Sequence, residues 1–270
     1  MFARRSMPKE FERFNQKWGA PDGSRFYKGL QRLPKVGHAL RETTLKSVLR
    51  YRGCFSFQPN SDTRTFEYPW CFYATELRAG MRAVDLGGSL AGFQFVLSKS
   101  GLEVINVDPG MDSHGRGWPV DEGAIRLLNS AFGTNVRLEN CFLSEAHIEP
   151  ASVDRVFSIS VVEHIPEEEI KQLIRKVWEI LKPEGLFVAT VDLFLNLRPF
   201  SSREVNEFGT NVPITTLVHA APFQIIVGRP AELYGFPEFS VDSCMRQVDQ
   251  LVLGRYPVLV QCIVLRKVGY

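Results

Sequence analysis

Two aspartates, each at the end of a short apolar run, are the residues best placed to do chemistry. Asp85 stands just before the small residues Gly87, Gly88 and Ser89, and Asp108 ends the next apolar run. Small residues where a strand turns into a helix let a ligand approach the backbone closely. An acid at the end of the next strand is placed to accept hydrogen bonds from both hydroxyls of a ribose. The pair therefore predicts a site for a nucleoside ligand.

The charge of Asp85 and the spacing of the glycines indicate which nucleoside is favoured. A dinucleotide would place its pyrophosphate over this turn, where a carboxylate repels it, whereas a ligand with an ammonium and a sulfonium would be attracted. The turn also departs from G-x-G-x-x-G, since Ser89 and Ala91 occupy later small-residue positions, and no G-x-x-x-x-G-K-[S/T] occurs. The alternative, in which Asp85 braces the turn and binds nothing, stays open.

A parallel sheet is needed to bring these residues together, and the rest of the chain predicts one. Short apolar runs alternate with helical patterns, which is typical of βαβ units. The expected strands are 82–86, 103–107, 135–138, 153–158, 185–191, 223–227 and 256–266. The expected helices are 8–18, 36–51, 66–77, 90–100, 121–132 and 166–181.

Composition excludes several classes of protein. The chain has 270 residues, of which 44% are hydrophobic and 23% charged, as in ordinary globular proteins. No apolar run approaches the roughly 18 residues of a membrane-spanning helix. The five cysteines are scattered without a C-x-x-C pair, so we expect neither a disulfide framework nor a metal site, and a cytoplasmic location.

The charge of the chain is unevenly distributed. Residues 1–50 contain 12 Lys and Arg against 4 Asp and Glu, although the whole chain has a net charge of only +2. These basic residues are dispersed rather than clustered, which favours a solvated helical face over a nucleic-acid site. Docking of an anionic partner on this segment remains the alternative.

Four motifs in order resemble the class I S-adenosylmethionine-dependent methyltransferases. They are Val84-Asp-Leu-Gly-Gly88, Val107-Asp108, the segment 154–164 that ends in Glu163-His164, and Leu181-Lys-Pro-Glu-Gly185. The Glu-His pair is similar to the small-molecule branch, the type 11-like methyltransferases. The resemblance covers about residues 80–192.

The resemblance implies a Rossmann-like doubly wound α/β fold. Its seven-stranded sheet would have an antiparallel last strand at 256–266, preceded by a helical N-terminal extension. Residues 1–80 would form that extension and a lid. Residues 81–270 would form the S-adenosylmethionine-binding methyltransferase domain, with an acceptor-pocket insertion at about 193–255.

The function implied is transfer of a methyl group from S-adenosylmethionine to a small organic acceptor, with a biosynthetic role. The alternatives are a nicotinamide-dependent oxidoreductase and a non-catalytic module that kept the fold. The expected partner is a small-molecule acceptor, with neither a nucleic acid nor a membrane, and the oligomeric state stays open.

The resemblance also assigns cofactor contacts. Asp85 and the turn would hold the methionine end, and Asp108 the ribose. Adenine would lie beside the residues that follow the third strand, where the usual Asp is replaced by Asn140. The aromatic run around Tyr68 precedes the first strand and would close over the cofactor as a lid, or pack on the sheet. The candidate cofactor contacts are Tyr68, Asp85, Gly87, Gly88, Ser89, Asp108, Pro109, Cys141, Phe142, Ser160 and Val161, of which Ser160 or Val161 would face the sulfonium.

Two histidines are the candidate catalytic residues. A general base is needed only if the acceptor is a hydroxyl or a protonated amine. His164 follows the end of the fourth strand and would act as base or orient the acceptor, or it caps a turn. His219, with Asp192, lies in the region after the fifth strand that often lines acceptor pockets in this family. Glu163 would act beside His164 or brace the cofactor turn.

Overall fold

The computed structural model describes residues 1–20, 43, 46, 47, 49–56, 60–113, 117 and 119–269. Most of the helix expected at 36–51 lies outside these residues. In the part of the chain that is described, no helix combines the length and the apolar character needed to cross a membrane.

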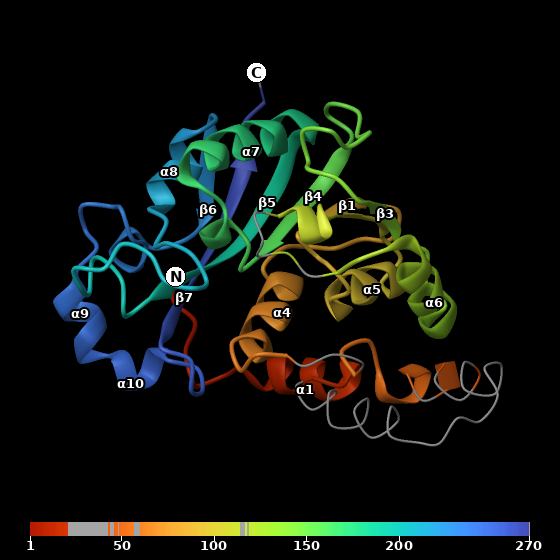
Figure 1. Cartoon of the computed structure of the whole chain (residues 1–270), viewed down its shortest axis with the longest axis horizontal. Helices are drawn as coiled ribbons and strands as arrows, with labels where there is room; N and C mark the ends of the chain where they lie inside the picture. Colours follow the sequence, from red (N-terminus) through yellow and green to blue (C-terminus); the bar gives the residue numbers. More distant parts are fainter. Residues whose placement is uncertain are drawn as a thin grey trace.

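A seven-stranded sheet forms the centre of the molecule (Figure 1). Its strands lie in the order β3-β2-β1-β4-β5-β7-β6, and β7 runs antiparallel to both of its neighbours while the others are parallel. The strands are β1 Arg82–Leu86, β2 Glu103–Val107, β3 Arg137–Glu139, β4 Val153–Ile159, β5 Leu181–Phe194, β6 Phe223–Val227 and β7 Val258–Lys267. The predicted fold class is confirmed, including the antiparallel last strand.

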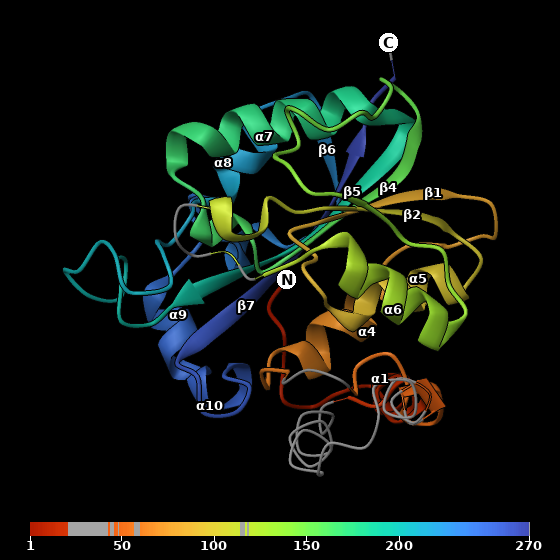
Figure 2. The same ribbon diagram turned by 45° about the vertical axis from the view of Figure 1, so that its right-hand side comes forward.

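Helices cover both faces of this sheet (Figure 2). On one face lie α7 Glu167–Ile180 and α8 Ile214–His219. On the other lie α4 Arg64–Tyr73, α5 Gly92–Lys99 and α6 Glu122–Phe132, with α1 Lys9–Trp18 packed against α4. The remaining helices are α9 Val241–Arg246, α10 Val248–Leu251 and the 3-10 turns η1 Gly110–Asp112, η2 Val162–His164 and η3 Pro230–Glu232.

The helix α7 shows how the sequence specifies one face. Glu167, Glu168 and Glu169 occupy its first turn, where carboxylates are stabilised by the positive end of the helix dipole. Its apolar residues recur at helical spacing, and the buried ones are Ile170, Ile174, Val177 and Ile180. This stripe lies on the sheet and leaves the carboxyl ends of the strands free for a site.

The strand β5 is longer than the expected 185–191. It begins at Leu181, directly after α7, because Leu181 pairs with Val153 before the register shifts. Glu184 adopts a positive φ of 62° at this irregularity. The strand continues to Phe194 because β7 pairs with it along the whole of this stretch. Asp192 therefore lies within a strand.

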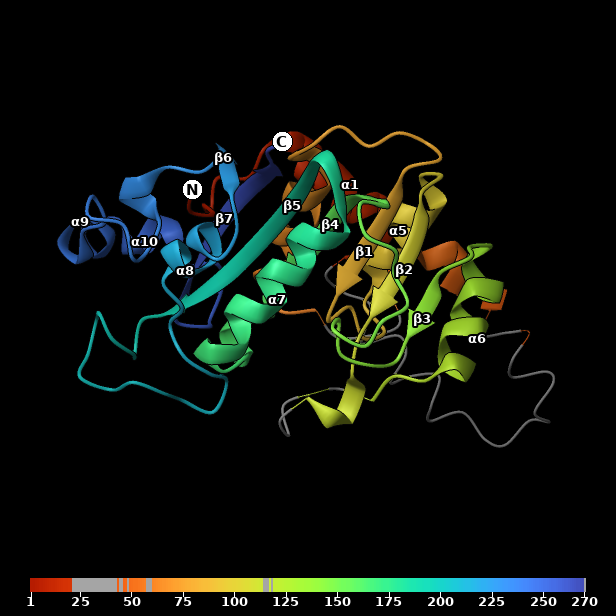
Figure 3. The ribbon, with the colours of Figure 1, turned by 90° about the horizontal axis from the view of Figure 1, so that it is seen from above.

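The strands β1, β2, β4 and β5 point the same way, so their carboxyl ends meet at one edge of the sheet (Figure 3). Ligands of open α/β sheets bind at this edge. Asp85 lies opposite Asn106 in the β1–β2 register, two residues before Asp108. The fold thus places both predicted aspartates at neighbouring strand ends.

Candidate functional site

The turn from β1 to α5 has no room for side chains at its glycines. Gly87 has a φ of 63°, and Ser89 also has a positive φ, 42°. A Cβ on Gly88 would lie 2.8 Å from both Asp85 Oδ2 and Asn106 Oδ1. Packing of the turn against Asp85 and Asn106 therefore requires a residue without a Cβ at Gly88, and the positive φ favours glycine at Gly87.

Two buried amides hold this turn in place. Gln94 Nε2 donates to the carbonyl oxygens of Gly88, Ser89 and Ala91 at 3.3, 2.9 and 3.1 Å. Asn106 Nδ2 donates to the Ser89 carbonyl at 2.7 Å. Neither amide belongs to a predicted motif, although each is a polar residue inside an otherwise apolar run. By fixing the carbonyls, they fix the shape of the turn.

The carboxyl group of Asp85 is buried and incompletely paired. The residue is 2% exposed, and its Oδ2 has no hydrogen-bond partner among the described residues. Burial and the nearby charge of Asp108 raise the pKa of Asp85 to about 7, against the influence of Arg64. A cation placed beside this oxygen would restore the ionised form.

Asp108 is held by the backbone on both sides. Its Oδ2 accepts a hydrogen bond from the Ser89 amide at 2.7 Å, and its Oδ1 accepts one from the Gly110 amide at 2.6 Å. Burial raises its pKa, and these two bonds oppose the rise. Each carboxylate oxygen has a further lone pair, so the group can still accept hydrogen bonds from a ribose.

These residues together fit a cationic nucleoside. The unpaired buried oxygen of Asp85 suits a positive charge, and Asp108 keeps acceptor capacity at the next strand end. The two acids lie on either side of the turn, since Asp85 Oδ2 packs against Gly88 and Asp108 accepts from the Ser89 amide.

The residues expected around adenine lie at the ends of β2 and β3. Asn140 Nδ2 donates to the Asp108 carbonyl at 2.8 Å, which ties the two strand ends together. Pro109 and Cys141 are half-buried, and Phe142 is 38% exposed. All of them therefore lie at the same edge as Asp108, on the side away from β4.

Val161 and Ser160 follow β4, on the other side of the turn. A Cβ on Gly87 would lie 2.9 Å from the methyl groups of Val161, so this side chain packs directly on the glycine turn. Ser160 adopts a φ of 49° and its amide donates to the Thr190 carbonyl at 3.0 Å. Its hydroxyl bonds to Arg64 and Glu67 of α4.

A buried charged network joins α4 to the ends of β4 and β5. Arg64 Nη1 lies 2.7 Å from Glu67 Oε2 and donates to Ser160 Oγ at 2.7 Å. Glu67 Oε1 accepts hydrogen bonds from Ser160 Oγ at 2.5 Å and from Thr190 Oγ1 at 2.6 Å. Arg64, Glu67 and Thr190 are functional candidates that no sequence motif indicates. The available signal was a charged pair at helical spacing inside an aromatic helix.

Glu163 and Asp192, which we term the acid pair, lie beside this network. The Asp192 amide donates to Glu163 Oε1 at 3.2 Å, and Asp192 Oδ1 lies 3.4 Å from Ser160 Oγ. Burial raises the pKa of Glu163 to about 8 and that of Asp192 well above its usual range, and mutual repulsion adds to the second shift. The site therefore contains three buried acids, Glu67, Glu163 and Asp192, around the single arginine of the network, Arg64.

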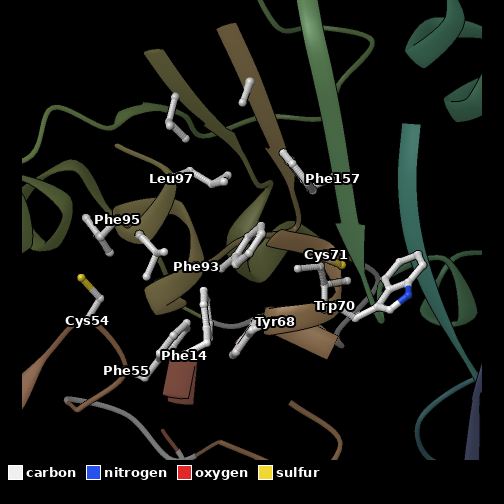
Figure 4. Packing of buried hydrophobic residues seen from close by; sticks show 14 of the residues in the cluster. Phe14, Cys54, Phe55, Tyr68, Trp70, Cys71, Phe93, Phe95, Leu97 and Phe157 are labelled. Atoms are coloured by element: carbon white, nitrogen blue, oxygen red, sulfur yellow. The ribbon is translucent and has the colours of Figure 1, made fainter. Parts of the chain in front are cut away.

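Tyr68 packs within the aromatic core of this face (Figure 4). Its ring stacks on Phe55 at 4.6 Å and on Phe93 at 5.7 Å between centroids. Burial raises the pKa of its hydroxyl to about 12. Packing between helices explains why Tyr68 is buried. The residue also lies near Asp85, beside the turn.

The structure separates the two candidate histidines. His164 is half-buried in η2 beside the acid pair, and its Nδ1 contacts the Phe208 carbonyl oxygen. His219 is exposed at the last residue of α8. It precedes β6, whose first residue Phe223 pairs with Lys267 at the edge where β5 begins. His219 thus lies toward the opposite edge of the sheet, and the structure does not bring it together with Asp85 and Asp108.

Comparison with known protein families and sequences agrees with this geometry. A family model described as a methyltransferase domain matches residues 84–189. An uncharacterized methyltransferase of Mycobacterium bovis is 25% identical over 176 residues, which cover 61% of this chain and 64% of that relative. The chain thus spans slightly less than two thirds of the curated relatives it matches.

Solved structures share the fold at low sequence identity. The 1,6-didemethyltoxoflavin-N1-methyltransferase of Burkholderia thailandensis is similar with a TM-score of 0.54 and 15% identity, covering 88% of this chain and 93% of that one. The [4+2]-cyclase SpnF is similar with a TM-score of 0.51 and 13% identity, covering 75% and 81%.

Proposed function

We propose that this chain, whose residues 84–189 belong to the methyltransferase-domain family and form a class I S-adenosylmethionine-dependent domain, methylates a small organic acceptor in a biosynthetic reaction. The observation that carries the proposal is the coincidence of that match with the turn and the strand ends that hold Asp85 and Asp108. The domain limits that we propose are 1–80 for the extension and lid, and 81–270 for the catalytic domain with its insertion at about 193–255.

The residues at the strand ends would each bind a different part of S-adenosylmethionine. S-adenosylmethionine supplies a methyl group on a positively charged sulfur. Asp85 and the backbone of the turn would hold its methionine end, and Asp108 its ribose. The half-exposed Phe142 and its neighbours Cys141 and Pro109 would border adenine. The chain's remaining task is to align the acceptor and exclude water, which accelerates a displacement of this kind greatly.

A small molecule is the acceptor that the surroundings favour. Elements outside the matched domain reach the carboxyl edge of the sheet: Arg64 and Glu67 of α4 bond to Ser160, and the Thr210 amide, after β5, bonds to the Glu163 carbonyl. Such additions around the edge suit a discrete acceptor rather than a polymer. The similar structure from Burkholderia thailandensis is described with bound 1,6-didemethyltoxoflavin and S-adenosylhomocysteine, which are both small molecules. The basic residues of the N-terminal segment are dispersed rather than clustered, which favours a small acceptor over a nucleic acid.

His164 is the proposed base or orienting group. It lies at the carboxyl edge, directly after Glu163, with one ring nitrogen held by the Phe208 carbonyl. A carbonyl oxygen can only accept a hydrogen bond, so the neutral ring carries its proton on Nδ1 and its lone pair on Nε2.

The cytoplasm is the proposed location. All five cysteines are unpaired in the structure, and four of them are buried. Free buried thiols are typical of proteins from a reducing compartment.

Calorimetric titration of the purified chain tests the function. We expect saturable binding of S-adenosylmethionine and of S-adenosylhomocysteine, and no binding of NADH. A folded protein that ignores both sulfur ligands would overturn the proposal, and binding of NADH alone would favour the oxidoreductase. Methylated product from small-molecule extracts, detected by mass spectrometry, would separate an enzyme from a non-catalytic module.

A further inference from the structure

The acid pair contains a buried oxygen that the protein leaves unpaired. Glu163 is fully buried and its Oε2 has no hydrogen-bond partner among the described residues. An unpaired buried carboxylate oxygen is destabilising, and native proteins rarely keep one without a reason. Glu163 lies at the end of β4, where ligands of this fold bind. A bound ligand would therefore supply the hydrogen-bond donor that Oε2 lacks.

The charge around the acid pair selects a positive ligand. Arg64 gives its hydrogen bonds to Glu67 and Ser160, so no cation in the described part of the chain bonds directly to the acid pair. The same acids do not converge as metal ligands, because no group of three or more His, Cys, Asp or Glu among the described residues is placed to hold a metal ion. An organic cation fits these two facts.

An aromatic cluster borders the acid pair. It consists of Phe194, Phe208 and Tyr256. The Phe208 and Tyr256 rings meet edge to face at 5.1 Å between centroids, and Phe194 lies 6.3 Å from Phe208 and 6.2 Å from Tyr256. Phe208 is 39% exposed, so the cluster reaches the surface. Aromatic faces attract cations, most strongly where water is excluded.

Several contacts hold this cluster against the acid pair. Phe194 follows Asp192 by two residues in β5, which puts both side chains on the same face of the sheet. The Thr210 amide donates to the Glu163 carbonyl at 3.0 Å, and the Phe208 carbonyl contacts His164. The hydroxyl of Tyr256 is close enough to feel the charge of Asp192, which together with burial raises its pKa.

We propose that the methyl acceptor carries a cationic nitrogen, an amine that is protonated in solution, and that this nitrogen binds between the acid pair and the aromatic cluster. The inference rests on the proposed function and names the acceptor class for it. Glu163 and Asp192 would pair with the positive nitrogen, and the three rings would contact the carbon groups on it.

The acid pair would also take part in the transfer. The ammonium of the acceptor gives a proton to an ionised carboxyl group of the pair and becomes a neutral amine. Its lone pair then forms the bond to the methyl carbon while the carbon–sulfur bond breaks, leaving its electron pair on sulfur as a neutral thioether. The product is a methylated ammonium, and the proton on the carboxyl group is released to water.

Matched probe compounds test this class. The probes are 2-phenylethylamine, tryptamine and histamine, each beside the alcohol with the same carbon skeleton, and benzyltrimethylammonium as a permanent cation. Binding to the full chain is measured by calorimetry in the presence of S-adenosylhomocysteine. We expect at least one of the four cations to bind about 10-fold more tightly than its neutral match, with benzyl alcohol as the match for the quaternary ion.

Two variants and a control localise the effect. E163Q should weaken cation binding by about 10-fold or more and change the affinity for S-adenosylhomocysteine less than about two-fold. F208A, at an exposed position where folding is not at risk, should weaken cation binding several-fold. E168Q removes an exposed carboxylate from the first turn of α7 and should leave cation binding unchanged.

The affinity of the wild-type chain for the cation should rise with pH up to about 8, because the acid pair must ionise to receive it. E163Q should flatten this rise. Equal binding of cations and neutral matches, absence of cation binding by a protein that binds S-adenosylhomocysteine, or equal losses in E163Q and E168Q would each overturn the inference. Failure to bind S-adenosylhomocysteine at all would instead overturn the proposed function.

Discussion

The two faces of the sheet differ in what they bury. Under α7 and α8 the strands contribute apolar side chains, among them Val84, Leu86, Ala189 and Val191. On the face covered by α4 and α5, the same strands also bury apolar residues such as Phe157 and Val188, but in addition they contribute Asp85, Thr190 and Asp192. The period of two along a strand lets one sheet have both kinds of face.

This difference separates stability from binding. The apolar face gains free energy from burial and close packing. The other face has an apolar core as well, but at the carboxyl ends of its strands it carries carboxyl groups whose burial is unfavourable and which are incompletely paired within the protein. Such groups are retained where a ligand completes them, so we expect substitutions on the two faces to have different consequences.

The largest effect should come from the apolar face. Ile174 is fully buried in α7, and Ile174→Ala removes apolar contacts and leaves a cavity. The free energy of unfolding should fall by about 2–5 kcal/mol. Urea denaturation followed by circular dichroism measures the change, with Lys171→Ala on the exposed side of the same helix as the control. In the remaining folded protein the affinity for S-adenosylmethionine should be unchanged, and a large loss of affinity would contradict the separation of the two faces.

The next effect should come from the other face, on binding. Asp108→Ala removes the acceptor for the ribose and for the Ser89 and Gly110 amides. Binding of S-adenosylmethionine should weaken by about 1–3 kcal/mol because hydrogen bonds to a charged group are lost. Calorimetry measures it beside Asp112→Ala, which removes an exposed carboxylate from the adjoining turn η1. Unchanged affinity in Asp108→Ala would mean that the ribose lies elsewhere.

A third effect is a pH dependence of the empty protein. The pKa of Asp85 is about 7 in the folded chain and near 3.8 when unfolded, so between these values the folded state keeps a proton that the unfolded state has released. Stability should therefore fall as pH rises from about 4 to about 7, by at most about 1.4 kcal/mol per pH unit from this group.

Asp85→Asn isolates the contribution of this carboxyl group. Urea denaturation at several pH values should give a shallower decline in the variant than in the wild type. Glu163 and Asp192 titrate in the same direction in both proteins and cancel in the comparison. Identical slopes would show that Asp85 does not titrate in this range.

Sequence reasoning succeeded where one segment specifies its own structure. The strands β1 and β2 begin and end at the predicted residues, because each is a short apolar run bounded by turn residues. The four motifs predict a methyltransferase domain, and a family model described as a methyltransferase domain matches residues 84–189. The early part of β5 was missed because its pairing with Val153 follows an irregularity that no local pattern signals. The short α8, α9 and α10 were missed because few residues give no clear period.

Only the part of the candidate site that lies within local motifs could be predicted from the sequence. Asp85 and Asp108 belong to motifs in which neighbouring residues reveal the role. Glu67, by contrast, bonds to Ser160 and Thr190, which follow it by 93 and 123 residues. No local pattern connects residues so far apart, and only the fold brings α4 onto the ends of β4 and β5. His219 was expected near the acceptor, but the chain after β5 returns toward the opposite edge before β6 begins.

The smallest effect should come from the outer edge of the proposed cofactor site, beside adenine. Phe142 follows β3 at the proposed adenine edge and is 38% exposed, so its ring contributes little to the core. Phe142→Ala should leave the free energy of unfolding nearly unchanged and weaken S-adenosylmethionine binding by about 0.5–1.5 kcal/mol, the contribution of one aromatic contact. Ile226→Ala, on the edge strand β6 and 44% exposed, is the matched control and should alter neither quantity by as much. If the two variants bind alike, adenine does not lie against Phe142, and the binding face ends at Asp108 and Asn140.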